Sequence, residues 1–220
     1  MHVAMRRFLA ALIIQSAAGI AFCGVAAHAG TVEDIQARGI VTCAVPANTP
    51  GIAAMEEGKR SGLAIDLCGV LAAAVLGRPA ATAFVEVSPD DAALALQAED
   101  ADILFMPQPW RLAQEAEEGM LLVQPLLQGP DGQIFGPVVR QGDDGWFVTV
   151  RWLLAGLVAR PVNIPDVDRN AAVSGLGLAP RWREEMAAFT ESYDALLARH
   201  MKPLADAGWS ALPVVEGPRF

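Results

Sequence analysis

Three short β-rich runs alternate with two helical segments between residues 40 and 105, and this alternation constrains the fold more than any other feature. The strands are expected at Ile40–Val45, Thr82–Val87 and Asp102–Phe105. Between them, Leu63–Leu76 has leucine and valine at i+4 spacing, and Ser88–Ala98 opens with serine and proline, which favour a helix start. Crossover helices between successive strands predict an α/β fold, a mostly parallel sheet with helices on both faces.

The rest of the chain is expected to add shorter elements to this unit. A helix is expected over Thr31–Gly39, with Thr31 as its N-cap and Gly39 at its end. Residues Ala47–Gly62 are polar and rich in glycine and proline, so they are expected to form a loop. Further along, the pattern predicts extended runs at Met120–Leu127 and Phe135–Val139, helices over Trp146–Ala159 and Ala179–His200 (one helix or two), and a Gly/Pro-rich tail over Pro203–Phe220.

The first 29 residues have the pattern of a secretory signal peptide. Arg6-Arg7 forms a basic start, Phe8–Ile14 begins an apolar core, and Ala27-His28-Ala29 fits a small-residue cleavage site. We therefore expect a signal peptide over 1–29, a mature chain over 30–220 that folds as a single domain, and a periplasmic location.

The charge of the mature chain limits its partners. The whole chain has a formal net charge of −9, and the leader contains Arg6 and Arg7 but no acidic residue, so its removal leaves −11. A negative charge of that size disfavours nucleic acid and anionic membrane surfaces. No apolar run after the leader is long enough to span a bilayer. We expect no nucleic acid partner and no membrane span after cleavage.

Few residues suited to catalysis or metal binding remain after cleavage. The mature chain has one histidine, His200, and two cysteines, Cys43 and Cys68. No triad pattern surrounds His200, and a Cys/His metal site would lack ligands. Acidic groups such as Glu115–Glu118 lack the spacing of a calcium loop and are better explained as solvated faces. We expect a protein that is not an enzyme and holds no metal and no cofactor.

The two remaining cysteines are expected to form a disulfide. Cys43 lies on the first predicted strand, and Cys68 lies on the helix that would pack against that strand. Export takes the chain to an oxidising compartment, where such pairs are usually bonded.

The stretch Ile103–Gln114 is the expected place for a ligand. Its apolar start, Ile103–Met106, is typical of a buried strand, and Pro107 and Pro109 are expected to end it because proline lacks a backbone donor. Open α/β sheets usually bind ligands beyond the carboxyl ends of their strands. The alternative is an ordinary connection between a strand and the next helix.

Three blocks of the sequence share their pattern with a known family. They are Thr31–Val45, Gly62–Leu104, which begins Gly-Leu-Ala-Ile-Asp-Leu-Cys, and Gly136–Leu157, which begins Gly-Pro-Val-Val-Arg-Gln-Gly-Asp-Asp-Gly-Trp-Phe. These blocks resemble the periplasmic polar amino-acid-binding proteins of ABC transporters (solute-binding protein family 3), especially the branch that binds L-amino acids generally. Gly175–Met201 matches more loosely, and both cysteines of the family pattern are present, which agrees with the expected disulfide.

The resemblance implies that this chain has one lobe where the family has two. Asp131–Gln133 resembles the family's exit from lobe one, and Gly136–Arg140, only a few residues later, resembles the return from lobe two. We therefore expect lobe one with its C-terminal helices, and a second lobe that is missing.

The resemblance also points to residues that would hold a ligand. In the family, the loop after the third strand binds the ligand α-carboxylate with backbone N–H groups, a hydroxyl and an arginine. Aligning Trp110 with the family's tryptophan puts Gln114 at the arginine position and Pro109 at the hydroxyl position. Glutamine lacks the charged fork of arginine, so binding would be weakened or altered. The candidate ligand-binding residues are Trp110, Arg111, Gln114, Gln108 and Thr49.

Two functions remain open at this point. The first is binding of a small polar solute such as an amino acid for an ABC permease. The second is a periplasmic protein-interaction or accessory module that has lost small-molecule binding. In the second case the missing lobe would expose an apolar wall near Pro107, Pro109, Trp110 and Phe135. Arg111 is a candidate substitute for the missing arginine, or else a surface residue.

Overall fold

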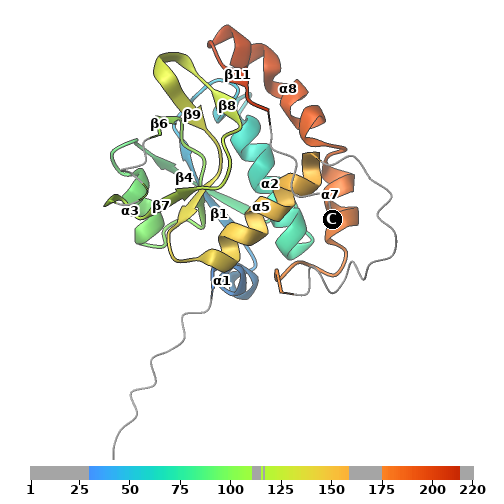
Figure 1. Ribbon diagram of the computed structural model, residues 1–220. Helices are drawn as coiled ribbons and strands as arrows, with labels where there is room; N and C mark the ends of the chain where they lie inside the picture. Colours follow the sequence, from blue (N-terminus) through green and yellow to red (C-terminus); the bar gives the residue numbers. More distant parts are fainter. Residues whose placement is uncertain (1–29, 111–114, 116, 159–174, 214–220) are drawn as a thin grey trace, which may run out of the picture.

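A five-stranded sheet runs through the protein in the order β4-β1-β5-β10-β7. The computed structural model describes residues 30–110, 115, 117–158 and 175–213 (Figure 1). β1 (Val41–Pro46) pairs in parallel with β4 (Thr82–Val87) and β5 (Ile103–Leu104). β10 (Val138–Arg140) runs antiparallel to β5 and to β7 (Met120–Leu122). Since only β10 runs against the other strands, the expected mostly parallel sheet is confirmed.

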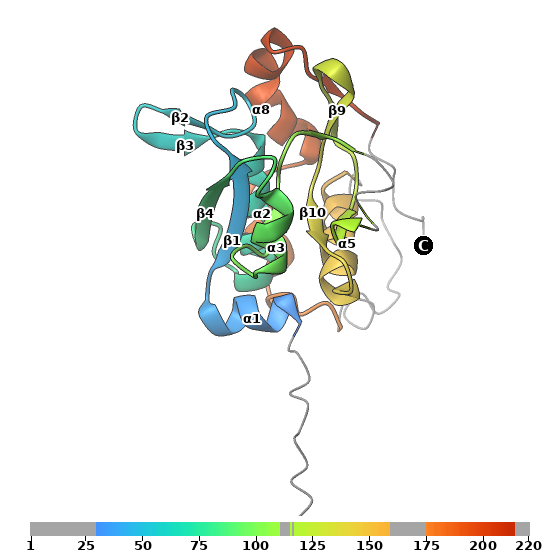
Figure 2. The same ribbon diagram turned by 90° about the vertical axis from the view of Figure 1, so that its left-hand side faces the viewer.

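Helices cover both faces of this sheet (Figures 1 and 2). On one face, α2 (Leu63–Leu76) and α5 (Asp144–Val158) pack against the strands and against each other. α7 (Trp182–Phe189) and α8 (Tyr193–Asp206) lie outside them and contact α2. α3 (Ala92–Gln97) covers the other face.

The side chains of the central strands alternate between two apolar clusters. Val41, Cys43 and Val45 of β1 belong to the larger cluster, on the side of α2 and α5. Ala44 of β1 and Leu104 of β5 belong to the smaller cluster, on the side of α3. Strands that are buried on both faces explain the near-continuous apolar runs in the sequence.

The predicted disulfide is present. Cys43 and Cys68 are bonded, with their Cα atoms 6.4 Å apart, and both side chains are buried. The bond ties β1 to α2, the strand and helix that the sequence indicated.

The sheet has an amino-terminal edge, where its parallel strands begin, and a carboxyl-terminal edge, where they end. The two edges are covered differently (Figure 2). α1 (Thr31–Arg38) lies at the amino-terminal edge and contacts α2 and α5. Its N-cap is Gly30 rather than the expected Thr31, and Gly39 ends it in the left-handed conformation as expected. At the opposite edge lies a hairpin of β2 (Ala54–Glu56) and β3 (Lys59–Ser61). The expectation of a plain loop over 47–62 was therefore wrong.

A second sheet of four short strands forms beside the carboxyl-terminal edge, in the order β11-β8-β9-β6. A 3-10 turn at Pro130–Gly132 joins β8 to β9, at the position where the second lobe is expected to be missing. The bounds are β6 Gln108–Pro109, β8 Leu127–Gln128, β9 Gln133–Phe135 and β11 Ser210–Ala211.

Prolines end the predicted elements less sharply than expected. Pro109 belongs to β6, which is an edge strand, so its missing N–H interrupts no second ladder. Pro203 lies inside α8, which continues to Asp206. Conversely, α3 begins at Ala92 and not at Pro89, because Ser88 Oγ accepts the Asp91 N–H (3.2 Å) in a turn before the helix.

Candidate ligand site

The sheet topology brings two candidate loops to one edge. β1 and β5 are parallel neighbours, so the chain leaves both strands at the carboxyl-terminal edge of the sheet. The loop after β1 carries Thr49, and the segment after β5 carries Gln108 and Trp110. This is the edge at which open α/β sheets bind their ligands.

The loop after β1 has a fixed backbone. The Thr49 N–H donates to the Ala53 carbonyl (2.5 Å), and the Ile52 carbonyl accepts the Ala64 N–H (3.0 Å) at the start of α2. Gly62 makes this contact possible, because its φ is +133° and a Cβ there would lie 2.2 Å from the Ile52 oxygen. Thr49 itself is half-buried, and its hydroxyl donates to the Ala47 carbonyl at 3.5 Å.

Gln108 is a buried polar side chain at this edge. It is 4% exposed, and it pairs with Ile134 of β9. Because Pro107 and Pro109 have no N–H, Gln108 carries the one backbone donor of these three residues. Its side-chain Nε2 has no hydrogen-bond partner among the described residues, a property that Gln124 Nε2 and the Tyr193 hydroxyl share. Such an unpaired buried amide costs about 1–3 kcal/mol.

The other candidate residues have different surroundings. Trp110 is half-buried and packs against the smaller apolar cluster, which contains Ala44 and Leu104. Arg111 and Gln114 lie outside the described residues. The structure thus places Thr49, Gln108 and Trp110 at one edge.

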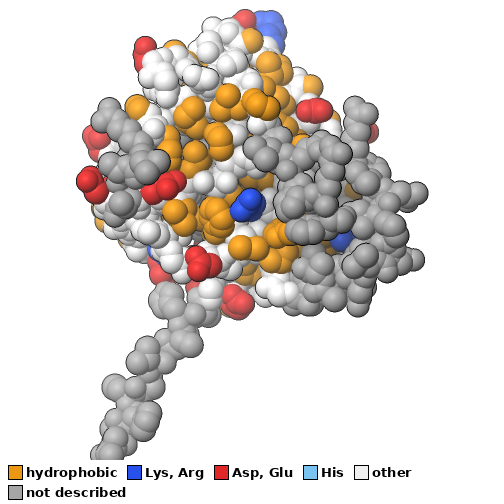
Figure 3. Space-filling view, viewed as in Figure 1, with side chains coloured by type: hydrophobic (Ala, Val, Ile, Leu, Met, Phe, Trp, Pro, Cys, Tyr) orange, Lys and Arg blue, Asp and Glu red, His pale blue; other side chains and the backbone are white. Residues whose placement is uncertain are grey.

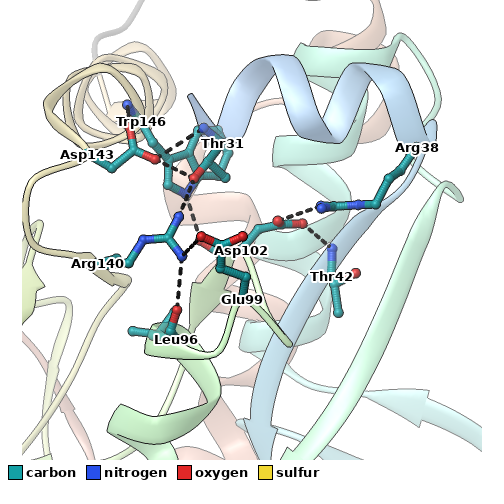
Figure 4. A network of polar contacts seen from close by, with 9 residues as sticks. All are labelled: Thr31, Arg38, Thr42, Leu96, Glu99, Asp102, Arg140, Asp143 and Trp146. Atoms are coloured by element: carbon teal, nitrogen blue, oxygen red, sulfur yellow. Dashed lines mark hydrogen bonds and ion pairs between the residues drawn. The ribbon is translucent and has the colours of Figure 1, made fainter. Parts of the chain in front are cut away.

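A network of charged side chains occupies the opposite edge of the sheet (Figure 4). Asp102, just before β5, accepts the Thr42 N–H (2.8 Å) and forms an ion pair with Arg38 of α1 (2.6 Å). The Trp146 indole N–H donates to the Asp102 carbonyl (2.8 Å). Burial raises the pKa of the Asp102 carboxyl above its ordinary value, and the contacts with Thr42 and Arg38 oppose that rise.

The same network joins α1 to α5 and β10. Arg140 of β10 pairs with Glu99 (3.2 Å) and donates to the Leu96 carbonyl (3.2 Å). Asp143 accepts the hydroxyl and the N–H of Thr31, and its other oxygen accepts the Trp146 N–H (3.0 Å). Sequence reasoning missed this network. Its members are paired with one another and hold the fold together, so we assign it no ligand.

Two further findings concern metal ions and membrane spans. Within the described ranges, no three histidine, cysteine, aspartate or glutamate side chains are grouped so as to hold a metal ion. No helix in that part of the chain is long and apolar enough to cross a membrane.

Comparison with known proteins identifies relatives whose sequences match about half of this chain. No protein-family model matches the sequence. AapJ, the general L-amino acid-binding periplasmic protein of Rhizobium johnstonii, is 31% identical over 111 residues, which are 49% of this chain and 33% of that protein. YhdW of Escherichia coli O157:H7, provisionally named an amino-acid ABC transporter-binding protein, is 33% identical over 96 residues, or 43% of this chain and 28% of that protein. The chain therefore spans about a third of the length of the relatives it matches.

Solved structures confirm the fold. An ABC transporter/periplasmic binding protein from Brucella ovis with glutathione bound matches with a TM-score of 0.67 at 18% identity, over 79% of this chain and 91% of that chain. A mutant of domain 1 from TmArgBP in its arginine-bound form matches with a TM-score of 0.50 at 20% identity, over 57% of this chain and 97% of that chain. The chain is therefore related in sequence to the amino-acid-binding proteins of ABC transporters, and it has the α/β fold of a periplasmic-binding-protein lobe.

Proposed function

We propose that this protein is an exported, one-lobed solute-binding protein that binds a small polar solute such as an amino acid and works with an ABC permease. The observation that carries the proposal is the arrangement of loops at the carboxyl-terminal edge of the sheet. There, the loops with Thr49 and with Gln108 and Trp110 leave adjacent strands, in a lobe related to amino-acid-binding proteins.

The unpaired amide of Gln108 supports a ligand at this edge. Buried polar groups in folded proteins are nearly always hydrogen-bonded, so an exception calls for an explanation. A ligand acceptor that reaches Gln108 after a small side-chain movement would supply the missing partner. The donor suits a carboxylate or carbonyl oxygen, both of which amino acids carry.

One lobe alone offers a ligand less burial than two, so we propose binding that is weaker than in a two-lobed protein. Gln114, which the resemblance places at the position of the family's arginine, would act in the same direction. Binding by one lobe has a structural parallel, because the domain 1 structure from TmArgBP is described as arginine-bound. No catalytic step is part of the proposal.

A thermal-shift screen of the mature protein against the standard amino acids and small polar solutes tests the proposal. A solute present at ten times its Kd stabilises the folded state by about 1.4 kcal/mol, which corresponds to about 3–5 °C for a chain of this length. We expect a shift of that size from one chemical class at millimolar concentration. No shift from any solute would contradict solute binding.

A second candidate function is a protein-interaction module, and the surface of α5 favours it. Apolar side chains gather on the face shown in Figure 3. Trp152 and Val148, one helical turn apart on α5, are 42% and 38% exposed. This is not the wall expected from the sequence, because Phe135 is buried and stacks against Phe105 with ring centroids 6.2 Å apart.

Binding of a periplasmic partner distinguishes the second candidate from the first. We would immobilise the wild type, Trp152→Ser, and the control Leu94→Ser, which changes an exposed leucine on α3. A partner retained by the wild type and the control but lost by Trp152→Ser favours the interaction module. Equal retention by all three proteins contradicts it.

A further inference from the structure

We infer that cleavage of the leader creates an ion pair at the start of the mature chain, between the new α-ammonium of Gly30 and the carboxylates of Glu33 and Asp143. The inference rests on the cleaved export signal that the proposed function includes. It concerns the amino-terminal edge of the sheet, away from the candidate ligand site.

Two carboxylates flank Gly30. It is the N-cap of α1, and Glu33 occupies the position from which a glutamate reaches back to the N-cap N–H in a capping box. A Cβ added at residue 30 would lie 2.9 Å from Glu33 Oε2 and 4.0 Å from Asp143 Oδ1. The φ of Gly30 is −66°, which any residue adopts, so glycine is not required by the backbone. Instead it leaves space for the carboxylates to approach.

Asp143 is fixed in this position by two helices. Its Oδ2 accepts the N–H (3.2 Å) and the hydroxyl of Thr31 in α1, and its Oδ1 accepts the Trp146 N–H (3.0 Å) in α5. Arg140 approaches Thr31 Oγ1 (3.4 Å) from β10, but its charge is paired with Glu99. Gly30, Glu33 and Asp143 border a pocket of about 50 Å³, which has room for a charged terminus and water.

Cleavage after Ala29 changes the chemistry of the Gly30 nitrogen. In the precursor this nitrogen is a neutral amide with one N–H. In the mature chain it is an ammonium with three donors and a positive charge. A positive charge at a helix N-terminus is unfavourable on its own, because the helix dipole is positive there. The carboxylates of Glu33 and Asp143 reverse that balance, so the fold gains stability when the leader is removed.

Chains with different first residues test this ion pair. We would compare the melting temperature of a chain that begins at Gly30, the same chain acetylated at its N-terminus, and a chain that begins at Ala29. Glu33 is exposed, so the Gly30 chain should melt higher than the other two by about 1–3 °C. High salt should reduce the difference. Equal melting temperatures would overturn the inference.

Substitution of Glu33 tests whether its carboxylate is a partner of the α-ammonium. Glu33→Gln should reduce the difference between the Gly30 and Ala29 chains by at least half. The matched control is Asp34→Asn, which removes a neighbouring acid from the same first turn and should leave the difference unchanged. If Glu33→Gln and Asp34→Asn reduce it equally, the effect is a general response to the helix dipole and the ion pair is overturned.

The mass of the protein isolated from the periplasm of an expressing host tests the cleavage itself. A mass that matches a chain beginning at Gly30 supports the inference, and a mass that matches any other first residue overturns it. Neither result depends on a ligand, so failure of solute binding and failure of this ion pair are told apart.

Discussion

The polar side chains at the two edges of the central sheet differ in whether they have hydrogen-bond partners. At the amino-terminal edge, the charged side chains of Asp102, Arg140 and Asp143 all have partners, and their contacts join α1, β1, β10 and α5. At the carboxyl-terminal edge, prolines flank Gln108, and its buried amide lacks a partner among the described residues. A satisfied network stabilises a fold, whereas an unsatisfied group reduces stability and is expected where a protein binds something. The paired network stabilises the amino-terminal edge, and the carboxyl-terminal edge is the one at which we propose binding.

Asp102→Ala should have the largest effect, because it breaks the amino-terminal network. It leaves Arg38 and the Thr42 N–H without their carboxylate partner. Since Arg38 is partly exposed, we expect a loss of about 2–3 kcal/mol in the free energy of unfolding, measured with urea. Asp100→Ala, at an exposed neighbouring position, should change it by less than about 0.5 kcal/mol. Equal effects would remove the distinction between the edges.

Gly136→Ala should disrupt the junction between the two sheets near the ligand edge. A Cβ at this position would lie 2.1 Å from the Gln124 carbonyl oxygen, which is backbone and cannot move freely. We expect a loss of about 2 kcal/mol or more. The control is Gly156→Ala on α5, where a Cβ meets nothing within 4 Å, and it should stabilise the helix by about 0.5–1 kcal/mol. A neutral Gly136→Ala would show that the junction is adaptable.

Gln108→Leu should separate stability from binding. Removing the unpaired amide should leave the free energy of unfolding unchanged or raise it by up to about 1 kcal/mol. The same change should abolish a solute-induced thermal shift. Gln128→Leu, at an exposed position on β8, should alter neither quantity. A loss of stability above about 1 kcal/mol in Gln108→Leu would assign Gln108 to the structure instead.

The pH dependence of stability should show a smaller effect of Asp102. Because burial raises the pKa of Asp102 from 3.8, the folded state holds the proton more tightly than the unfolded state. The contribution of the Asp102 carboxyl to the free energy of unfolding is fully present below pH 3.8. It is lost as the pH rises through the pKa of this group in the folded state. The stability difference between wild type and Asp102→Asn should therefore fall over that window. A difference that rises with pH would contradict the assigned shift.

The periodic elements could be predicted from the sequence, and the contacts between distant residues could not. α2 and β4 have the bounds that their apolar pattern and flanking glycines and prolines indicated. The β2–β3 hairpin was missed because its turn is Glu57-Gly58, both with positive φ, in place of the usual Asn-Gly. Its strands are also too short for alternation to be visible.

The meeting of the two candidate loops at one edge could be predicted from the sequence, but the contacts of their side chains could not. The strand alternation predicted that the chain leaves β1 and β5 at one edge, and the parallel pairing of these strands confirms it; that a ligand binds there stays a prediction. Whether Gln108 would be buried depends on its pairing with β9, which no local pattern reveals. The amino-terminal network joins residues as far as 112 positions apart, such as Thr31 and Asp143. Charges at such separations carry no periodic signal.

An NMR titration of the mature protein tests the central claim most directly. Backbone amide signals would be recorded with each standard amino acid added to millimolar concentration. We predict that one chemical class changes the signals of residues 47–53 and 105–110, while Thr42, Asp102 and Trp146 at the amino-terminal edge stay unchanged. No change with any amino acid, or changes confined to the amino-terminal edge, would contradict the claim that the carboxyl-terminal edge is the binding edge.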